Sequence, residues 1–64
     1  MSKYTIVHRK RGERRSHRCG YRTEDIAMLR EIGVGEVESG EYVFVKIIDA
    51  DSEKLIELLS KATR

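Results

Sequence analysis

The sequence predicts a small α+β domain with the order ββαββα, in which an antiparallel sheet is covered by helices. Two runs rich in β-branched and aromatic residues, at 4–7 and 41–48, predict strands. Two stretches with apolar residues at helical spacing, 24–32 and 52–62, predict helices. A chain of 64 residues has room for one domain only.

The first 22 residues predict an N-terminal basic hairpin. Tyr4-Thr5-Ile6-Val7 has strand composition, and Gly12-Glu13 can form a two-residue turn with glycine where a type II′ turn requires it. Folding the chain about this turn pairs apolar residues with one another and gathers the arginines on the opposite face. The predicted pairs are Tyr4 with Tyr21, Ile6 with Cys19, His8 with His17, and Lys10 with Arg15. A disordered basic loop is the alternative.

Residues 24–32 predict a short helix. Thr23 can act as its N-cap, and two acidic residues follow where the helix dipole favours negative charge. Gly33 can take the left-handed conformation that ends a helix. The residues at helical spacing are Ile26, Leu29 and Ile32. A strand over 26–34 is the alternative.

A second pair of strands is predicted over 34–37 and 41–48, joined by a turn at Ser39-Gly40. Nearly every residue of the longer strand is apolar, so both of its faces need to be covered. Helices can cover one face. The other face then meets a second layer, a partner chain or a ligand.

The last element is predicted to be a C-terminal amphipathic helix over 52–62. Asp51 or Ser52 can cap it, and Glu57 with Lys61 forms a favourable i,i+4 pair on the exposed side. Its apolar stripe consists of Leu55, Ile56, Leu58, Leu59 and Ala62.

Charge is distributed very unevenly along the chain. Residues 1–22 contain eight lysines and arginines and one acid, a net charge of +7, whereas residues 23–64 contain five bases and ten acids, a net charge of −5. The domain, 1–64, therefore divides into a basic hairpin over 1–22 and an acidic α/β body over 23–64. Such separation of charge indicates an electrostatic role for the first part of the chain.

The basic segment predicts a small nucleic-acid-binding protein, because guanidinium groups neutralise phosphates and release counterions. A two-stranded ribbon can enter the major groove of DNA, and an arginine-rich element can dock on structured RNA. Regulatory, chromatin and ribosome-associated roles all fit. The candidate site residues are His8, Arg9, Lys10, Arg11, Arg14, Arg15, His17, Arg18 and Arg22.

Two other interpretations of the basic segment remain open. It could be a solvated run of charge that serves solubility, although such surfaces usually mix both signs. It could instead dock on an acidic protein, which would make the chain an inhibitor or adaptor.

The four aromatic residues could add base stacking to a basic surface. Strict alternation would place Tyr42 and Phe44 on one face of the long strand together with Lys46, and would place Tyr21 opposite Tyr4. In so small a chain, packing in the core is the favoured interpretation for each of them.

Metal binding and catalysis find little support. His8, His17 and Cys19 are the only nitrogen and sulfur ligands, fewer than a structural zinc site needs, and neither a phosphate-binding loop nor a nucleophile motif occurs. We therefore expect neither an enzyme nor a cofactor.

A single cysteine and the lack of a long apolar run predict a cytoplasmic protein without a membrane contact. The chain contains no Asn, Gln or Pro, a tendency of thermophile proteins. Because the core is small, self-association is expected to help stability, as a homodimer through the 41–48 strand or the 52–62 helix.

Overall fold

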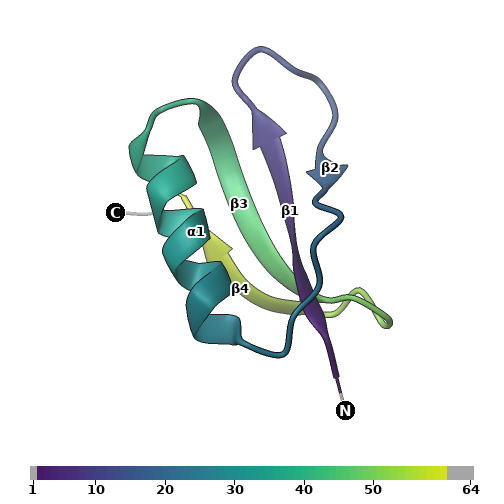
Figure 1. The fold of residues 1–64 in the computed structure, drawn as a ribbon. Helices are drawn as coiled ribbons and strands as arrows, with labels where there is room; N and C mark the ends of the chain where they lie inside the picture. The colour runs from purple at the N-terminus through teal and green to yellow at the C-terminus, as the bar shows by residue number, and fades with distance from the viewer. Residues whose placement is uncertain (1, 61–64) are drawn as a thin grey trace.

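Four antiparallel strands and one helix make up the part of the chain that the computed structural model describes, residues 2–60. In chain order they are β1 (Tyr4–Lys10), β2 (His17–Arg18), α1 (Ile26–Glu38), β3 (Tyr42–Asp49) and β4 (Leu55–Leu59). The strand order in the sheet is β2-β1-β3-β4, and α1 lies across one face (Figure 1). The predicted α+β class is confirmed, but with one helix in this range instead of two.

The centre of the sheet is the pairing of β1 with β3, in which Ile6 lies opposite Ile47 and His8 opposite Val45. Because side chains alternate along a strand, these four residues point towards α1. The helix contributes Leu29 and Val37 to the same layer. The resulting core cluster consists of Ile6, Leu29, Val37, Val45 and Ile47, each no more than 7% exposed.

The predicted helix exists, but it begins two residues later and ends six residues later than expected. Asp25 is the N-cap, and its carboxylate accepts a hydrogen bond from the Met28 backbone N–H at 3.0 Å. Gly33 does not end the helix, and the strand predicted over 34–37 is wrong, because those residues form its last turns. Packing of the helix against the sheet outweighs the low helix propensity of its two glycines.

Gly33 is buried where α1 approaches the sheet most closely. A Cβ atom added there would lie 2.6 Å from Leu59 Cδ1 and 3.1 Å from Val45 Cγ1. Val45 is fully buried and cannot move away easily. Gly35, half a turn further on, has no atom within 4 Å of the same position. The two glycines are therefore in the helix for different reasons.

We expect opposite results from placing alanine at these two positions. Gly35→Ala should raise the free energy of unfolding by about 0.5–1 kcal/mol, because alanine restricts the unfolded chain and favours helix. Gly33→Ala should lower it by about 1–3 kcal/mol through overpacking. Urea unfolding followed by circular dichroism measures both. Equal stability of the two variants would show that the close approach at Gly33 is absent.

The helix predicted over 52–62 is wrong for the described residues: Leu55–Leu59 form strand β4, and residues 61 and 62 lie outside the described range. A short apolar run fits a helical stripe and a strand equally well. The structure uses it to pair with β3, where Leu59 lies opposite Val45 and Leu58 opposite Lys46. This pairing satisfies the backbone groups of β3 that β1 leaves free.

The turn between β3 and β4 is fixed by Asp49. Its carboxylate accepts hydrogen bonds from the backbone N–H groups of Asp51 at 2.9 Å and Ser52 at 3.0 Å. Glu53, in the same turn, adopts a positive φ of 64°. The Ser52 bond, followed by the Asp51 bond, holds the pKa of Asp49 below its ordinary value, because both favour the charged carboxylate.

Strand β2 pairs with β1 over two positions, Val7 with Arg18 and His8 with His17. The two-residue turn predicted at Gly12-Glu13 does not form. The Glu13 N–H instead donates to the Lys10 carbonyl at 3.0 Å, which centres the turn on Arg11 and Gly12. At the other end of β1, two extra residues bulge out, so that Tyr4 pairs with Thr23 and not with Tyr21. The regular hairpin predicted over 4–21 is thus interrupted at both ends.

Candidate nucleic-acid interface

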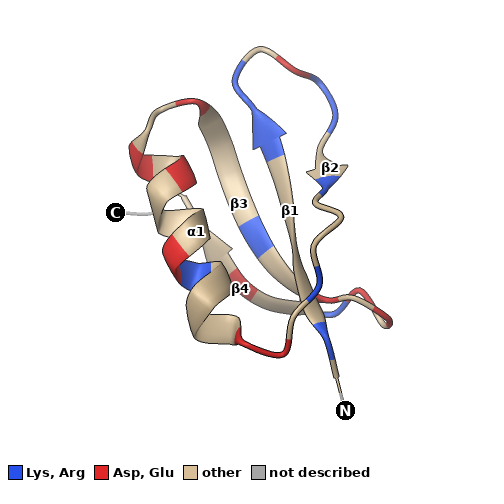
Figure 2. Cartoon of the chain, viewed as in Figure 1, with Lys and Arg blue, Asp and Glu red and all other residues tan. Residues whose placement is uncertain are grey.

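Residues 9–18, which we call the cationic arm, comprise the end of β1, the loop that follows it, and β2. The loop, residues 11–16, projects beyond the rest of the sheet (Figure 2). The base of this loop is tied to the turn before β3. The Arg11 N–H donates to the Glu41 carbonyl at 2.7 Å, and its Nε donates to the Gly40 carbonyl at 2.9 Å. These bonds limit the movement of the arm at the point where it leaves the sheet.

Most cationic groups of the arm have no carboxylate partner. Residues 2–60 contain two ion pairs, Arg18 with Glu53 and Arg30 with Glu57, and two contacts between a histidine and a carboxylate, His8 with Glu36 and His17 with Glu13. Arg18 is thus the one arginine of the arm that contacts an acid, at 3.5 Å, and an exposed pair of this length contributes little. Within the described range, the other lysine and arginines of the arm contact no carboxylate, although Arg11 bonds the Gly40 carbonyl.

Acidic residues are concentrated along α1 and the turns that flank it, whereas lysines and arginines are concentrated in the arm (Figure 2). These acidic residues are Glu24, Asp25, Glu31, Glu36, Glu38 and Glu41. Two other acids lie at the arm itself, since Glu13 is part of it and Glu53 contacts Arg18. The charge separation along the sequence is therefore largely kept in the fold (Figure 2).

The two candidate histidines lie in different environments. His8 points towards α1, where its Nδ1 is 2.7 Å from Glu36 Oε1 and its ring stacks on Tyr42 with centroids 4.6 Å apart. His17 is exposed, with Nε2 3.5 Å from Glu13 Oε1. Only His17 belongs to the arm.

The structure divides the nine candidate residues into three groups. Arg22 precedes Thr23, which pairs with the first residue of β1, so it lies near the opposite end of that strand, about 20 Å from the tip by strand rise. His8 lies under the helix. The remaining seven belong to the arm, and they are Arg9, Lys10, Arg11, Arg14, Arg15, His17 and Arg18.

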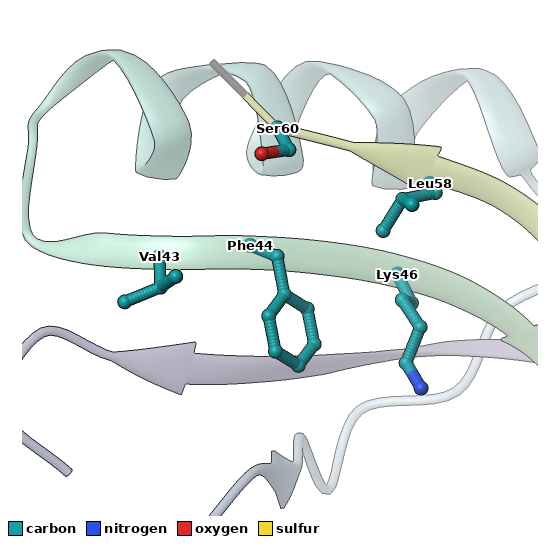
Figure 3. A pocket seen from close by; sticks show the side chains of 5 residues that line it. All are labelled: Val43, Phe44, Lys46, Leu58 and Ser60. Carbon is teal, nitrogen blue, oxygen red and sulfur yellow. The ribbon is translucent and has the colours of Figure 1, made fainter. Parts of the chain in front are cut away.

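A second basic surface lies on the face of the sheet opposite α1, which we call the open face. Phe44 is at its centre, with the Arg9 guanidinium carbon 5.6 Å and the Lys46 ammonium 5.5 Å from the ring centroid. The ring borders a hollow of about 350 Å³ (Figure 3). The hollow is lined by Val43, Phe44, Lys46, Leu58 and Ser60.

A β-bulge creates this arrangement. Arg9 pairs with Phe44 but Lys10 pairs with Tyr42, so Val43 has no partner on β1. Val43 therefore turns to the same side as Phe44 (Figure 3), while Tyr42 turns to the helix and stacks on His8. The prediction that Tyr42 would share a face with Phe44 and Lys46 is wrong for this reason.

Lys46 was not among the candidate residues, although the sequence held a signal for it. It is the one charged residue in the apolar run from Tyr42 to Ile48. A lysine there indicates the face of the strand that the core does not cover. Its proximity to Arg9 depends on the pairing of β1 with β3, which no local pattern reveals.

The described part of the chain forms no metal site, disulfide or membrane-spanning helix. Residues 2–60 hold no group of three His, Cys, Asp or Glu side chains that could bind a metal ion. Cys19 is a free, half-buried thiol against the core cluster. No helix in this range is long and apolar enough to cross a membrane.

Comparison with known proteins gives no relative. The chain matches no protein-family model, no curated protein and no solved structure.

Proposed function

We propose that this protein binds nucleic acid, and that the cationic arm contacts the phosphates. One observation supports this most directly: within residues 2–60, the cations at the tip of the arm have no carboxylate partner. The proposed contact residues are Arg9, Lys10, Arg11, Arg14, Arg15 and Arg18, with His17 and Arg22 at the margin. His8 is omitted, because Glu36 and Tyr42 already surround it.

The chemistry of the contact follows from the side chains. A guanidinium group presents paired N–H donors that match two phosphate oxygens, and each neutralised phosphate releases counterions. Arg14 and Arg15 are exposed and can reorient freely towards a phosphate. The acidic helix repels a polyanion, so binding is confined to the opposite side of the molecule.

The fixed base of the arm supports the same function. Because Arg11 is bonded to the turn before β3, less backbone freedom is lost when the arm binds. The loop of the arm is thereby held at the end of the sheet where Arg9 pairs with Phe44.

We expect binding to depend steeply on salt. If the arm neutralises about four phosphates, the logarithm of the affinity should fall with the logarithm of salt concentration with a slope of about −4, a loss of about a hundredfold between about 50 and 200 mM salt. Fluorescence anisotropy with labelled duplex DNA, structured RNA and single-stranded oligonucleotides measures this slope. Affinity that does not change with salt would contradict phosphate binding.

An acidic protein partner is the competing function, and it would show the same dependence on salt. Purification of the full chain from cells, with and without nuclease, separates the two. Loss of the bound material after nuclease treatment supports nucleic acid. A protein that stays bound in stoichiometric amount after nuclease treatment supports the adaptor or inhibitor interpretation instead.

A further inference from the structure

We infer that the open face of the sheet binds single-stranded nucleic acid, with a base stacked on Phe44 and its phosphates held by Arg9 and Lys46. This inference rests on the proposed function, because it assumes that nucleic acid is the ligand. It goes further by naming the class of nucleic acid and the residue that distinguishes it from a duplex.

The first support is the position of Phe44. An aromatic ring in so small a domain is expected in the core, but α1 and the core cluster lie on the other face of the sheet. Phe44 is only partly buried, and it borders a hollow lined also by the aliphatic Val43 and Leu58 and by Lys46 and Ser60 (Figure 3). Nucleic-acid bases stack on such rings whatever their sequence, because every base has a flat π-face.

The second support is the charge around the ring. Arg9 and Lys46 both lie within 6 Å of the Phe44 centroid, and Arg18 crosses the same face to reach the Ala50 carbonyl at 3.3 Å. No strand position on the open face within residues 2–60 carries an acidic side chain. Two like charges beside one ring, with no counter-charge among their strand neighbours, are complementary to an anion.

The side chain of Arg9 adds a third observation. Its Nε atom is buried and has no hydrogen-bond partner in the described range. This N–H group gains an acceptor if the Arg9 side chain swings away from the sheet towards a phosphate oxygen.

The exchange of a cation for a base on the ring is favourable. A cation on a partly exposed ring strengthens an interaction by about two- to fivefold, whereas base stacking strengthens it by about five- to 150-fold for each base. Arg9 and Lys46 are long and flexible, so each can leave the ring and contact a phosphate beside the stacked base. Both interactions are then made at once.

A single strand fits this face better than a duplex or a second copy of the chain. The bases of a duplex are stacked on one another and cannot reach Phe44 without being unpaired. A second copy that packed its own open face here would bring Arg9 and Lys46 against residues of the same charge. A strand with exposed bases supplies both the flat surface and the negative charge.

The test compares three forms of the full chain and two matched oligonucleotides. Wild type, Phe44→Tyr and Phe44→Leu are titrated with a single strand of about eight nucleotides and with an abasic strand of equal length, which retains the phosphates and lacks the bases. Wild type and Phe44→Tyr should bind the base-bearing strand about tenfold more tightly than the abasic strand. Phe44→Leu should bind both about equally. Single-stranded RNA and DNA are tested in separate arms.

Each outcome decides between the inference and the proposed function. If Phe44→Leu retains the preference for bases, or if wild type has no such preference, the stacking site is wrong and phosphate binding by the arm stands. If no form binds any oligonucleotide at low salt, both proposals fail. A wild-type dimer that Phe44→Leu converts to monomers in sedimentation would assign the face to a second copy and overturn the inference. Circular dichroism verifies that each variant is folded.

Discussion

Replacing Arg14 and Arg15 together with glutamate is expected to weaken nucleic-acid binding by about a hundredfold at low salt and to reduce the salt slope by about two. Both side chains are exposed, and neither makes an ion pair or hydrogen bond within residues 2–60. The free energy of unfolding should therefore change by less than about 0.5 kcal/mol. Anisotropy titrations at several salt concentrations measure the first effect, and urea unfolding measures the second.

A matched control separates the position of the charge from its amount. Lys3 and Lys54 are also exposed, and they lie near the opposite end of the sheet, where Lys3 bonds Ala50 and Lys54 bonds Asp49 through the backbone. Replacing both lysines with glutamate changes the net charge by the same amount as the double arginine variant. Binding should weaken much less. An equal loss from both double variants would show that net charge, and not the cationic arm, determines binding.

Leu29→Ala is expected to have the largest effect on stability. Leu29 is 1% exposed and lies in the core cluster between α1 and the sheet. Removal of a leucine side chain from such a position costs about 2–5 kcal/mol through lost burial and the cavity that remains. The whole domain has a stability of roughly 3–10 kcal/mol on the usual scale per residue. We therefore expect the variant to be largely unfolded near body temperature.

The control for this variant is on the same helix. Ile32, one turn further on, is 41% exposed, and its replacement by alanine should cost less than about 1 kcal/mol. Urea unfolding of both variants by circular dichroism compares them directly. If Leu29→Ala were no less stable than Ile32→Ala, this would contradict the burial of Leu29 between α1 and the sheet.

Local signals explain which elements could be predicted from the sequence. The strand over 41–48 was predicted to within one residue at each end, because six of its eight residues have high strand propensity and leave few alternatives. The start of α1 was predicted to within two residues, although its N-cap is Asp25 and not the predicted Thr23. These signals act between neighbours in the chain and do not require knowledge of the rest of the fold.

The errors arise where distant contacts decide between two local solutions. A glycine such as Gly33 is compatible with the end of a helix. In the fold, however, Gly33 is a buried helical residue, because Val45 and Leu59 leave no room for a side chain at this position. The run from Leu55 to Leu59 is compatible with a helix, but the edge of β3 selects a strand. Neither contact can be inferred from residues within a few positions of the error.

The candidate site divides in the same way. The cationic arm could be predicted because its charges are consecutive in the sequence, although the division of the nine residues into three groups could not. The site around Phe44 depends on the pairing of Arg9 with a residue 35 positions later, and on the bulge at Val43. Only the fold brings the cations and the ring together.

The position of β1 in the middle of the sheet has a consequence for how the chain folds. Tyr4 pairs with Asp49 and Lys10 with Tyr42, so β1 pairs with a strand that is synthesised more than thirty residues later. Pairings of such long range are slow to form. The sheet therefore cannot assemble around β1 until β3 has been synthesised.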